Sequence, residues 1–101
     1  MEKVVLTIGH KIGSVDALDD ATICNCVTTT LKVDAFTAIP CMGMWKGVPE
    51  SSTRIEIVTD DPSSVTMYVP HLAWQLDQEA IMCEIQPVNV SFPTAIIPAT
   101  A

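Results

Sequence analysis

The order of strand-like and helix-like segments constrains the fold of this chain more than any other feature of its sequence. Aliphatic residues run almost without interruption from Lys3 to His10, which is typical of a central strand. A helical pattern follows from about Val15 to Lys32, with Ser14 as the expected N-cap. Strand-like patterns then cover Ala35–Val48 and Thr53–Thr59. The first part of the chain is therefore predicted to be strand, helix, strand, strand.

The second helical pattern contains a proline. Apolar residues recur at helical spacing from Val65 toward Gln78, yet Pro70 lies within the pattern. Because proline lacks an N–H group and clashes with the preceding turn, two arrangements remain open. In one, a helix from about Ser64 breaks near Pro70; in the other, a helix starts at Val69. A last strand is expected over Ala80–Ile85.

The order strand, helix, strand, strand, helix, strand is that of the split βαβ arrangement. Right-handed crossovers in such a chain place both helices on one face of an antiparallel sheet. We therefore predict an α+β, ferredoxin-like βαββαβ sandwich. Residues 1–93 form the expected single domain and residues 94–101 a C-terminal tail, with Val88–Phe92 as a candidate further edge strand. Pro40 is compatible with its strand only at an edge, a start or a bulge.

Composition narrows the expected partners and location. The chain has 101 residues, 49% hydrophobic and 17% charged, and a formal net charge of -7. So small a chain cannot hide all its apolar surface in one core, so we expect a homodimer through the open sheet face. The five basic residues do not cluster, which argues against nucleic acid.

Membrane-span and signal-peptide patterns also bear on the expected location of the protein. No apolar run approaches the roughly 18 to 20 residues that cross a bilayer, so no membrane span is expected. The sequence shows no signal-peptide pattern, and we expect a cytoplasmic protein with reduced cysteines.

The cysteines do not form a recognisable metal motif. Cys24 and Cys26, two positions apart on a helix, diverge by about 200 degrees. Cys41 and Cys83 have no histidine at ligand spacing. We therefore interpret all four as small buried hydrophobes and expect no metal and no other cofactor.

The segment from Gly43 to Arg54 is the most informative for binding. It gathers an aromatic ring, both charge signs and several hydroxyl groups around one turn, Gly47–Ser52. The ring of Trp45 can pack on the sheet and offer its N–H group, while Glu50 and Arg54 are placed to pair across a hairpin or to hold a polar ligand. His10 lies at a strand end, where functional groups often lie. The candidate ligand-binding residues are Trp45, Glu50, Ser52, Arg54 and His10.

Part of the sequence resembles an uncharacterised family of small bacterial domains. The resemblance lies in Gly43-x-Trp45, in Glu50-x-Ser52, in Gln78-Glu79-Ala80-Ile81 and in Val88-x-Val90-Ser91-Phe92. It implies a ferredoxin-like fold and no particular activity. It marks Trp45, Glu50, Ser52 and Gln78 as positions to test.

Two functions from different classes are compatible with these features. The first is a dimeric, non-enzymatic module that binds a small molecule or a partner protein on the open sheet face or beside the hairpin tip. The alternative is a small dimeric α+β enzyme that uses the sheet face as a cavity. In that enzyme His10, His71 or Glu50 acts as acid or base, and Trp45 forms a wall.

Overall fold

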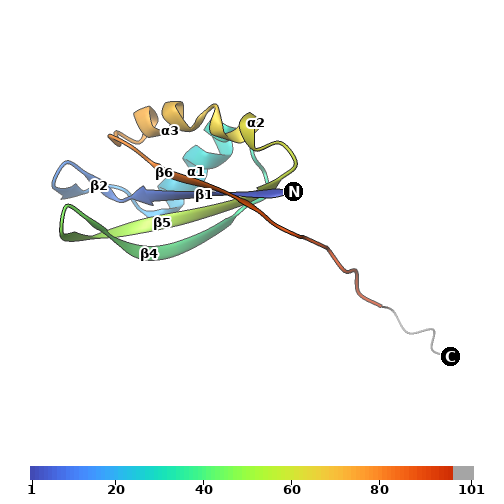
Figure 1. The fold of residues 1–101 in the computed structure, drawn as a ribbon. Coiled ribbons are helices and arrows are strands. Elements are labelled where there is room, and N and C mark those ends of the chain that lie inside the picture. The colour runs from blue at the N-terminus through green and yellow to red at the C-terminus, as the bar shows by residue number, and fades with distance from the viewer. Residues whose placement is uncertain (97–101) are drawn as a thin grey trace.

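The computed structural model describes residues 1–96 and confirms the predicted α+β, ferredoxin-like sandwich. A four-stranded antiparallel sheet has the order β4-β5-β1-β6, and all helices lie on one side of it (Figure 1). The strands of this sheet are β1 (Glu2–Gly9), β4 (Thr37–Trp45), β5 (Val48–Thr59) and β6 (Met82–Pro87). The helices are α1 (Asp20–Leu31), α2 (Pro62–Thr66) and α3 (Val69–Gln75). A two-stranded sheet pairs β2 (Lys11–Ile12) with β3 (Val15–Asp16).

The core lies between the sheet and the helices. Alternate residues of β1 face the helices: Val4 is paired with Ile57 and Leu6 with Ile55, whereas Ile8 is paired with the buried Thr53. The helices contribute Ile23, Val27, Leu31, Val65, Val69, Leu72 and Leu76 to the same cluster. Each fully buried aliphatic side chain contributes about 1.5 to 3 kcal/mol relative to exposure, so this single layer is the main source of stability.

The face of the sheet away from the helices carries a charged cluster beside exposed apolar side chains. Glu56 lies opposite Val5 in register, and its carboxylate is 3.0 Å from Arg54 Nε and 3.8 Å from Lys3 Nζ. Val5 is fully buried although no helix covers this face. Long charged side chains cover it in place of a helix, since their stems are apolar.

Several exposed apolar side chains lie at the hairpin that joins β4 to β5. Met42 is 75% exposed and Met44 70%, and Trp45 and Val48 are more than half exposed. The turn consists of Lys46 and Gly47 alone, both with positive φ, as in type I′ hairpins. The predicted turn over Gly47–Ser52 is therefore wrong, and β5 begins five residues before the predicted start at Thr53.

The first helix begins later than its sequence pattern predicts. Asp19, not Ser14, is the N-cap, and its Oδ1 accepts a hydrogen bond from the Thr22 N–H at 2.8 Å. The residues before it cannot be helical, because the N–H groups of Ala17 and Leu18 both donate to the carbonyl of His10. They form the β2–β3 hairpin at the end of β1.

The second helical segment is broken just before Pro70. Helix α2 ends at Thr66, Tyr68 is the N-cap of α3, and Pro70 lies in the first turn of α3, where its missing N–H group costs nothing. Each of the two predicted arrangements is thus correct in part. A short helix precedes the break, and a new helix starts at Val69.

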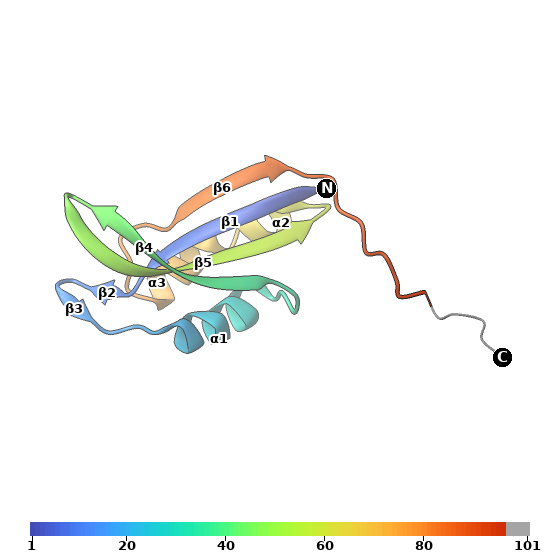
Figure 2. The same cartoon turned by 90° about the horizontal axis from the view of Figure 1, so that it is seen from below.

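The predicted edge strand over Val88–Phe92 is not present. The Val88 N–H donates to the Met1 carbonyl at 3.1 Å, and the described residues after it, Asn89 to Ile96, are not part of a strand. The chain then leaves the body of the protein as an extension, seen at the lower right of Figure 1 and at the right of Figure 2. Of the predicted tail, residues 94–96 belong to this extension, and residues 97–101 lie outside the described residues.

Candidate functional site

Strand alternation divides the predicted binding residues between the two faces of the sheet. Glu50, Ser52 and Arg54 are alternate residues of β5 and share the open face. Trp45 pairs with Val48, so it belongs to that face as well. His10 lies two residues after Ile8, which faces the helices. The His10 ring also lies on the helix side of the sheet, where it contacts Thr53. Four of the five candidates therefore share a face, and His10 does not.

The carboxylate of Glu50 lies directly against the backbone of β1. Its Oε1 accepts the Lys11 N–H at 3.4 Å. A Cβ atom placed on Gly9 would lie 2.0 Å from this oxygen and 2.7 Å from Glu50 Cδ, so only glycine leaves room for the carboxylate. The two residues come together because β1 and β5 are neighbours, with Gly9 paired to Ser52.

Gln78 binds the backbone of Lys11, next to the contact between Glu50 and Gly9. Its Nε2 donates to the Lys11 carbonyl at 2.9 Å and to the Leu76 carbonyl at 3.2 Å. Lys11 is thus held through its N–H group by Glu50 and through its carbonyl by Gln78. The resemblance in the sequence marked Gln78 as a position to test, and the structure gives it an anchoring contact across 67 residues of chain.

The remaining candidates on the open face differ in burial and in their hydrogen-bond or ion-pair partners. Ser52 is almost fully buried, and its hydroxyl reaches only the Glu50 carbonyl, at 3.4 Å. Arg54 pairs with Glu56 and not with Glu50, which corrects the expected pair across the hairpin. Trp45 remains open to a ligand, with the Lys46 ammonium 5.7 Å from the centre of its ring.

A second polar cluster lies on the helix side of the same strand. His10 Nε2 is 2.7 Å from Thr53 Oγ1 and 3.4 Å from Asp20 Oδ1, and the Thr53 hydroxyl donates to Asp20. Because that hydroxyl has a single hydrogen, its oxygen accepts from His10, so Nε2 carries a proton. The cluster ties the end of β1 to the first turn of α1.

Sequence reasoning missed Thr53 and Asp20. Thr53 is fully buried and lies in the same alternating series as Ile55 and Ile57. A polar residue in the core series of a strand is the signal that could have found it, because a buried hydroxyl needs a hydrogen-bond partner.

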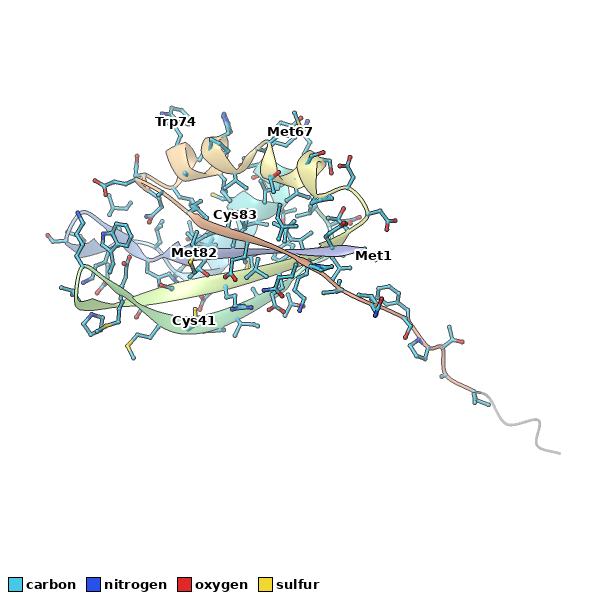
Figure 3. All side chains as sticks on the ribbon, viewed as in Figure 1. Met1, Cys41, Met67, Trp74, Met82 and Cys83 are labelled. Atoms are coloured by element: carbon cyan, nitrogen blue, oxygen red, sulfur yellow. The ribbon has the colours of Figure 1, made fainter. Side chains whose placement is uncertain are left out.

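The thiol groups of Cys24 and Cys83 are not activated. Burial raises the pKa of the Cys24 and Cys83 thiols, and the nearby carboxylates of Asp20 and Glu84 raise it further. The interpretation of all four cysteines as buried is wrong: Cys83 on β6 is exposed, and Cys24, Cys26 and Cys41 are only half-buried. Cys41 on β4 and Cys83 lie at opposite edges of the sheet (Figure 3). A thiol with a raised pKa is a poor nucleophile and a poor metal ligand at neutral pH.

Two surface hollows are lined by residues of the helices and of the segments that flank them. One of about 400 Å³ lies between the end of α1, the end of β5 and α2, and one of about 320 Å³ lies between α1 and α3. Lys32 and Tyr68 line both. His71 lines the smaller one, with its ring centre 5.7 Å from that of Trp74. None of the five predicted ligand-binding residues lines either hollow, whereas His71, a candidate acid or base of the alternative enzyme, lines the smaller one.

Residues 1–96 contain no group of three or more His, Cys, Asp or Glu side chains placed to hold a metal ion. Within the same part of the chain, no helix has both the length and the apolar character that crossing a membrane requires.

No family model matches this sequence, and no curated protein matches it. Solved structures do match. A phage SAM lyase in complex with S-methyl-5'-thioadenosine superposes with a TM-score of 0.64 at 17% sequence identity, over 84% of this chain and 79% of that chain. A phage SAM lyase in the apo state gives a TM-score of 0.62 at 18% identity, over 84% of this chain and 78% of that chain. At these identities the likeness shows a shared fold.

Proposed function

We propose that this protein binds a small cationic nucleoside of the S-adenosylmethionine class at the Glu50 end of its open sheet face and cleaves it as a lyase. The observation that carries the proposal is the Glu50 carboxylate, held against Gly9 and the Lys11 N–H on a face that no helix covers. A fixed carboxylate favours a cation, and the net charge of -7 attracts one over longer distances.

The chemistry of such a ligand fits the neighbouring side chains. Its sulfonium and ammonium groups are positive, and its adenine ring stacks on aromatic side chains. Trp45 shares the open face with Glu50 and is 55% exposed, so its ring is available for stacking. The match in fold to a phage SAM lyase with S-methyl-5'-thioadenosine bound supports this ligand class and this reaction.

In the proposed reaction the Glu50 carboxylate takes a proton from the carbon next to the one bonded to sulfur, and that C–H electron pair forms a carbon–carbon double bond as the carbon–sulfur bond breaks. Sulfur keeps the bonding electron pair of the broken bond and becomes the neutral thioether of S-methyl-5'-thioadenosine, and the other product is an unsaturated amino acid. Glu50 orients the positively charged part of the substrate and is the acid–base residue of the site. Trp45 forms one wall.

A second candidate is a binding module without catalysis. It is favoured by the separation of His10 from Glu50, because the sheet lies between them and they cannot act as an acid–base pair on one ligand. Cytoplasmic location and self-association of the chain belong to both proposals. The four free cysteines suit a reducing compartment.

The test is to mix the purified protein with S-adenosylmethionine and follow S-methyl-5'-thioadenosine by chromatography, together with the melting temperature. Release of this product supports the lyase, and Glu50→Gln should reduce it at least tenfold. Glu84→Gln, which changes another glutamate of the open face, is the matched control and should retain activity. A rise in melting temperature without product supports the binding module. Neither product nor a rise in melting temperature would overturn both.

A further inference from the structure

The extension after β6 has the pattern of a strand but lacks a partner. Val88, Val90 and Phe92 alternate with Asn89 and Ser91. From Asn89 to Ile96, no residue makes a backbone hydrogen bond to another residue that the structure describes. Phe92 is 79% exposed. An alternating segment of this kind is stable as a strand only when it pairs with another strand.

Strand β4 has the complementary feature, an edge without a partner. It is the outer strand of the order β4-β5-β1-β6, so one of its two sides has no neighbour in the sheet. Met42 and Met44 are alternate residues of β4 and are exposed near its end. Edge strands are usually protected by charged side chains, but β4 is the one strand of this sheet that carries none.

The distribution of charge favours contact between these two segments in different copies. With a net charge of -7, two copies of the chain repel each other. No charged residue occurs from Ala35 to Trp45 or after Glu84. A contact between β4 and the extension therefore buries apolar side chains without bringing like charges together.

The extension cannot easily pair with β4 of its own copy. It leaves from the end of β6, and two further strands lie between β6 and β4. The β4–β5 hairpin and the extension also lie at opposite ends of the sheet (Figures 1 and 2). The partner has to come from outside the copy.

We propose that Val88–Phe92 pairs as an additional strand with the free edge of β4 in a second copy of this chain. Backbone hydrogen bonds supply the affinity, and Val90 and Phe92 cover the exposed Met42 and Met44. Pro93 ends the added strand, and Pro40 limits the pairing at the other end because it lacks an N–H group. Each copy donates one extension and accepts one.

Sedimentation analysis across a range of protein concentrations tests the proposal. The unchanged chain should associate, and Phe92→Asp should raise the dissociation constant at least tenfold. Thr94→Asp adds the same charge beyond Pro93 and is the matched control, which should associate like the unchanged chain. The proposal is overturned if the unchanged chain is monomeric throughout, or if the two variants associate equally.

A mixing experiment identifies the two surfaces. Phe92→Asp and Met42→Lys should each be monomeric alone, because each damages one side of the contact. Their mixture should form a heterodimer, since the aspartate of one extension then meets the lysine of the other chain's β4. If Val58→Asp, on the open face, dissociates the copies while Phe92→Asp does not, the contact lies on the open face and the proposal is wrong.

Discussion

The carboxylate of Glu50 occupies the space that any side chain at position 9 would need. The two residues lie 41 positions apart and meet because β1 and β5 are adjacent, with the Glu50 Oε1 atom 2.0 Å from the position of a Cβ on Gly9. Glu50 can therefore hold its carboxylate in this position only if residue 9 is glycine.

Gly9→Ala should therefore move Glu50 without unfolding the protein. The atom that must shift is the far end of a flexible side chain, and alanine is a better strand residue than glycine, so the free energy of unfolding should change by less than about 1 kcal/mol. Product release or ligand binding should fall as far as it does in Glu50→Gln. Urea unfolding and the product assay measure the two effects separately.

Gly43→Ala is the control for this variant. A Cβ on Gly43 meets only Ser52 Oγ, at 3.7 Å, which is an ordinary contact, so Glu50 stays in place and function should persist. Equal losses in Gly9→Ala and Gly43→Ala would contradict the positioning of Glu50 by Gly9.

Thr53→Val should destabilise the protein by about 1 to 3 kcal/mol. The valine has nearly the same shape but cannot accept from His10 or donate to Asp20, so His10 Nε2 loses its nearest partner. Thr7→Val, a matched change in β1 on the open face, should cost no more than about 0.5 kcal/mol. Denaturant unfolding of both variants measures the difference. Equal losses in the free energy of unfolding would show that the cluster of His10, Thr53 and Asp20 does not stabilise the protein.

Asp19 should give the protein an acid-dependent component of stability. The Thr22 side chain and N–H group hold the pKa of this carboxyl below its usual value of 3.8. A lowered pKa in the folded state stabilises the fold above pH 3.8, and this contribution is lost as the pH falls through the folded-state value. Asp19→Ala should lower Tm at pH 7 and have a smaller effect at pH 2. Asp19→Asn keeps a capping oxygen, so it should lose less at pH 7. Tm measured against pH for the three proteins checks the expected order.

Lys46→Asn should stabilise the hairpin by about 0.5 to 1 kcal/mol. Lys46 has a φ of 50° and Gly47 a φ of 77°, and asparagine adopts positive φ more readily than lysine. Gly47→Ala at the next position should have the opposite sign and cost about 1 to 2 kcal/mol. Thermal unfolding distinguishes them. A destabilised Lys46→Asn would mean that the contact of Lys46 with Trp45 outweighs the backbone preference.

Patterns that repeat within one segment were sufficient to predict most of the fold. The apolar run of β1 and the alternation around Ile55 and Ile57 reflect burial on one face of a strand, and burial is visible in spacing. The order of the elements then led to the ferredoxin-like topology. Pro40 also lies where its chemistry requires, on an edge strand.

The errors occurred where distant contacts decide the local structure. Ser14 and Asp19 are both good N-cap residues, and the choice between them depends on the His10 carbonyl, which holds the intervening chain out of the helix. The site shows the same limit. Sequence spacing placed Glu50 near Ser52, but only the pairing of strands could reveal Gly9 beneath it or Asp20 beside Thr53.

The alternation of β5 also determines which genetic changes this strand tolerates. Thr53 lies on the helix side of the sheet, and Glu50 and Arg54 lie on the open face. Successive residues of β5 therefore contribute to opposite faces. A substitution affects one face at a time. An insertion or deletion of a single codon within β5 would exchange the faces of every residue beyond it, bringing the charged series into the core. This strand can therefore diverge in composition but must keep its length.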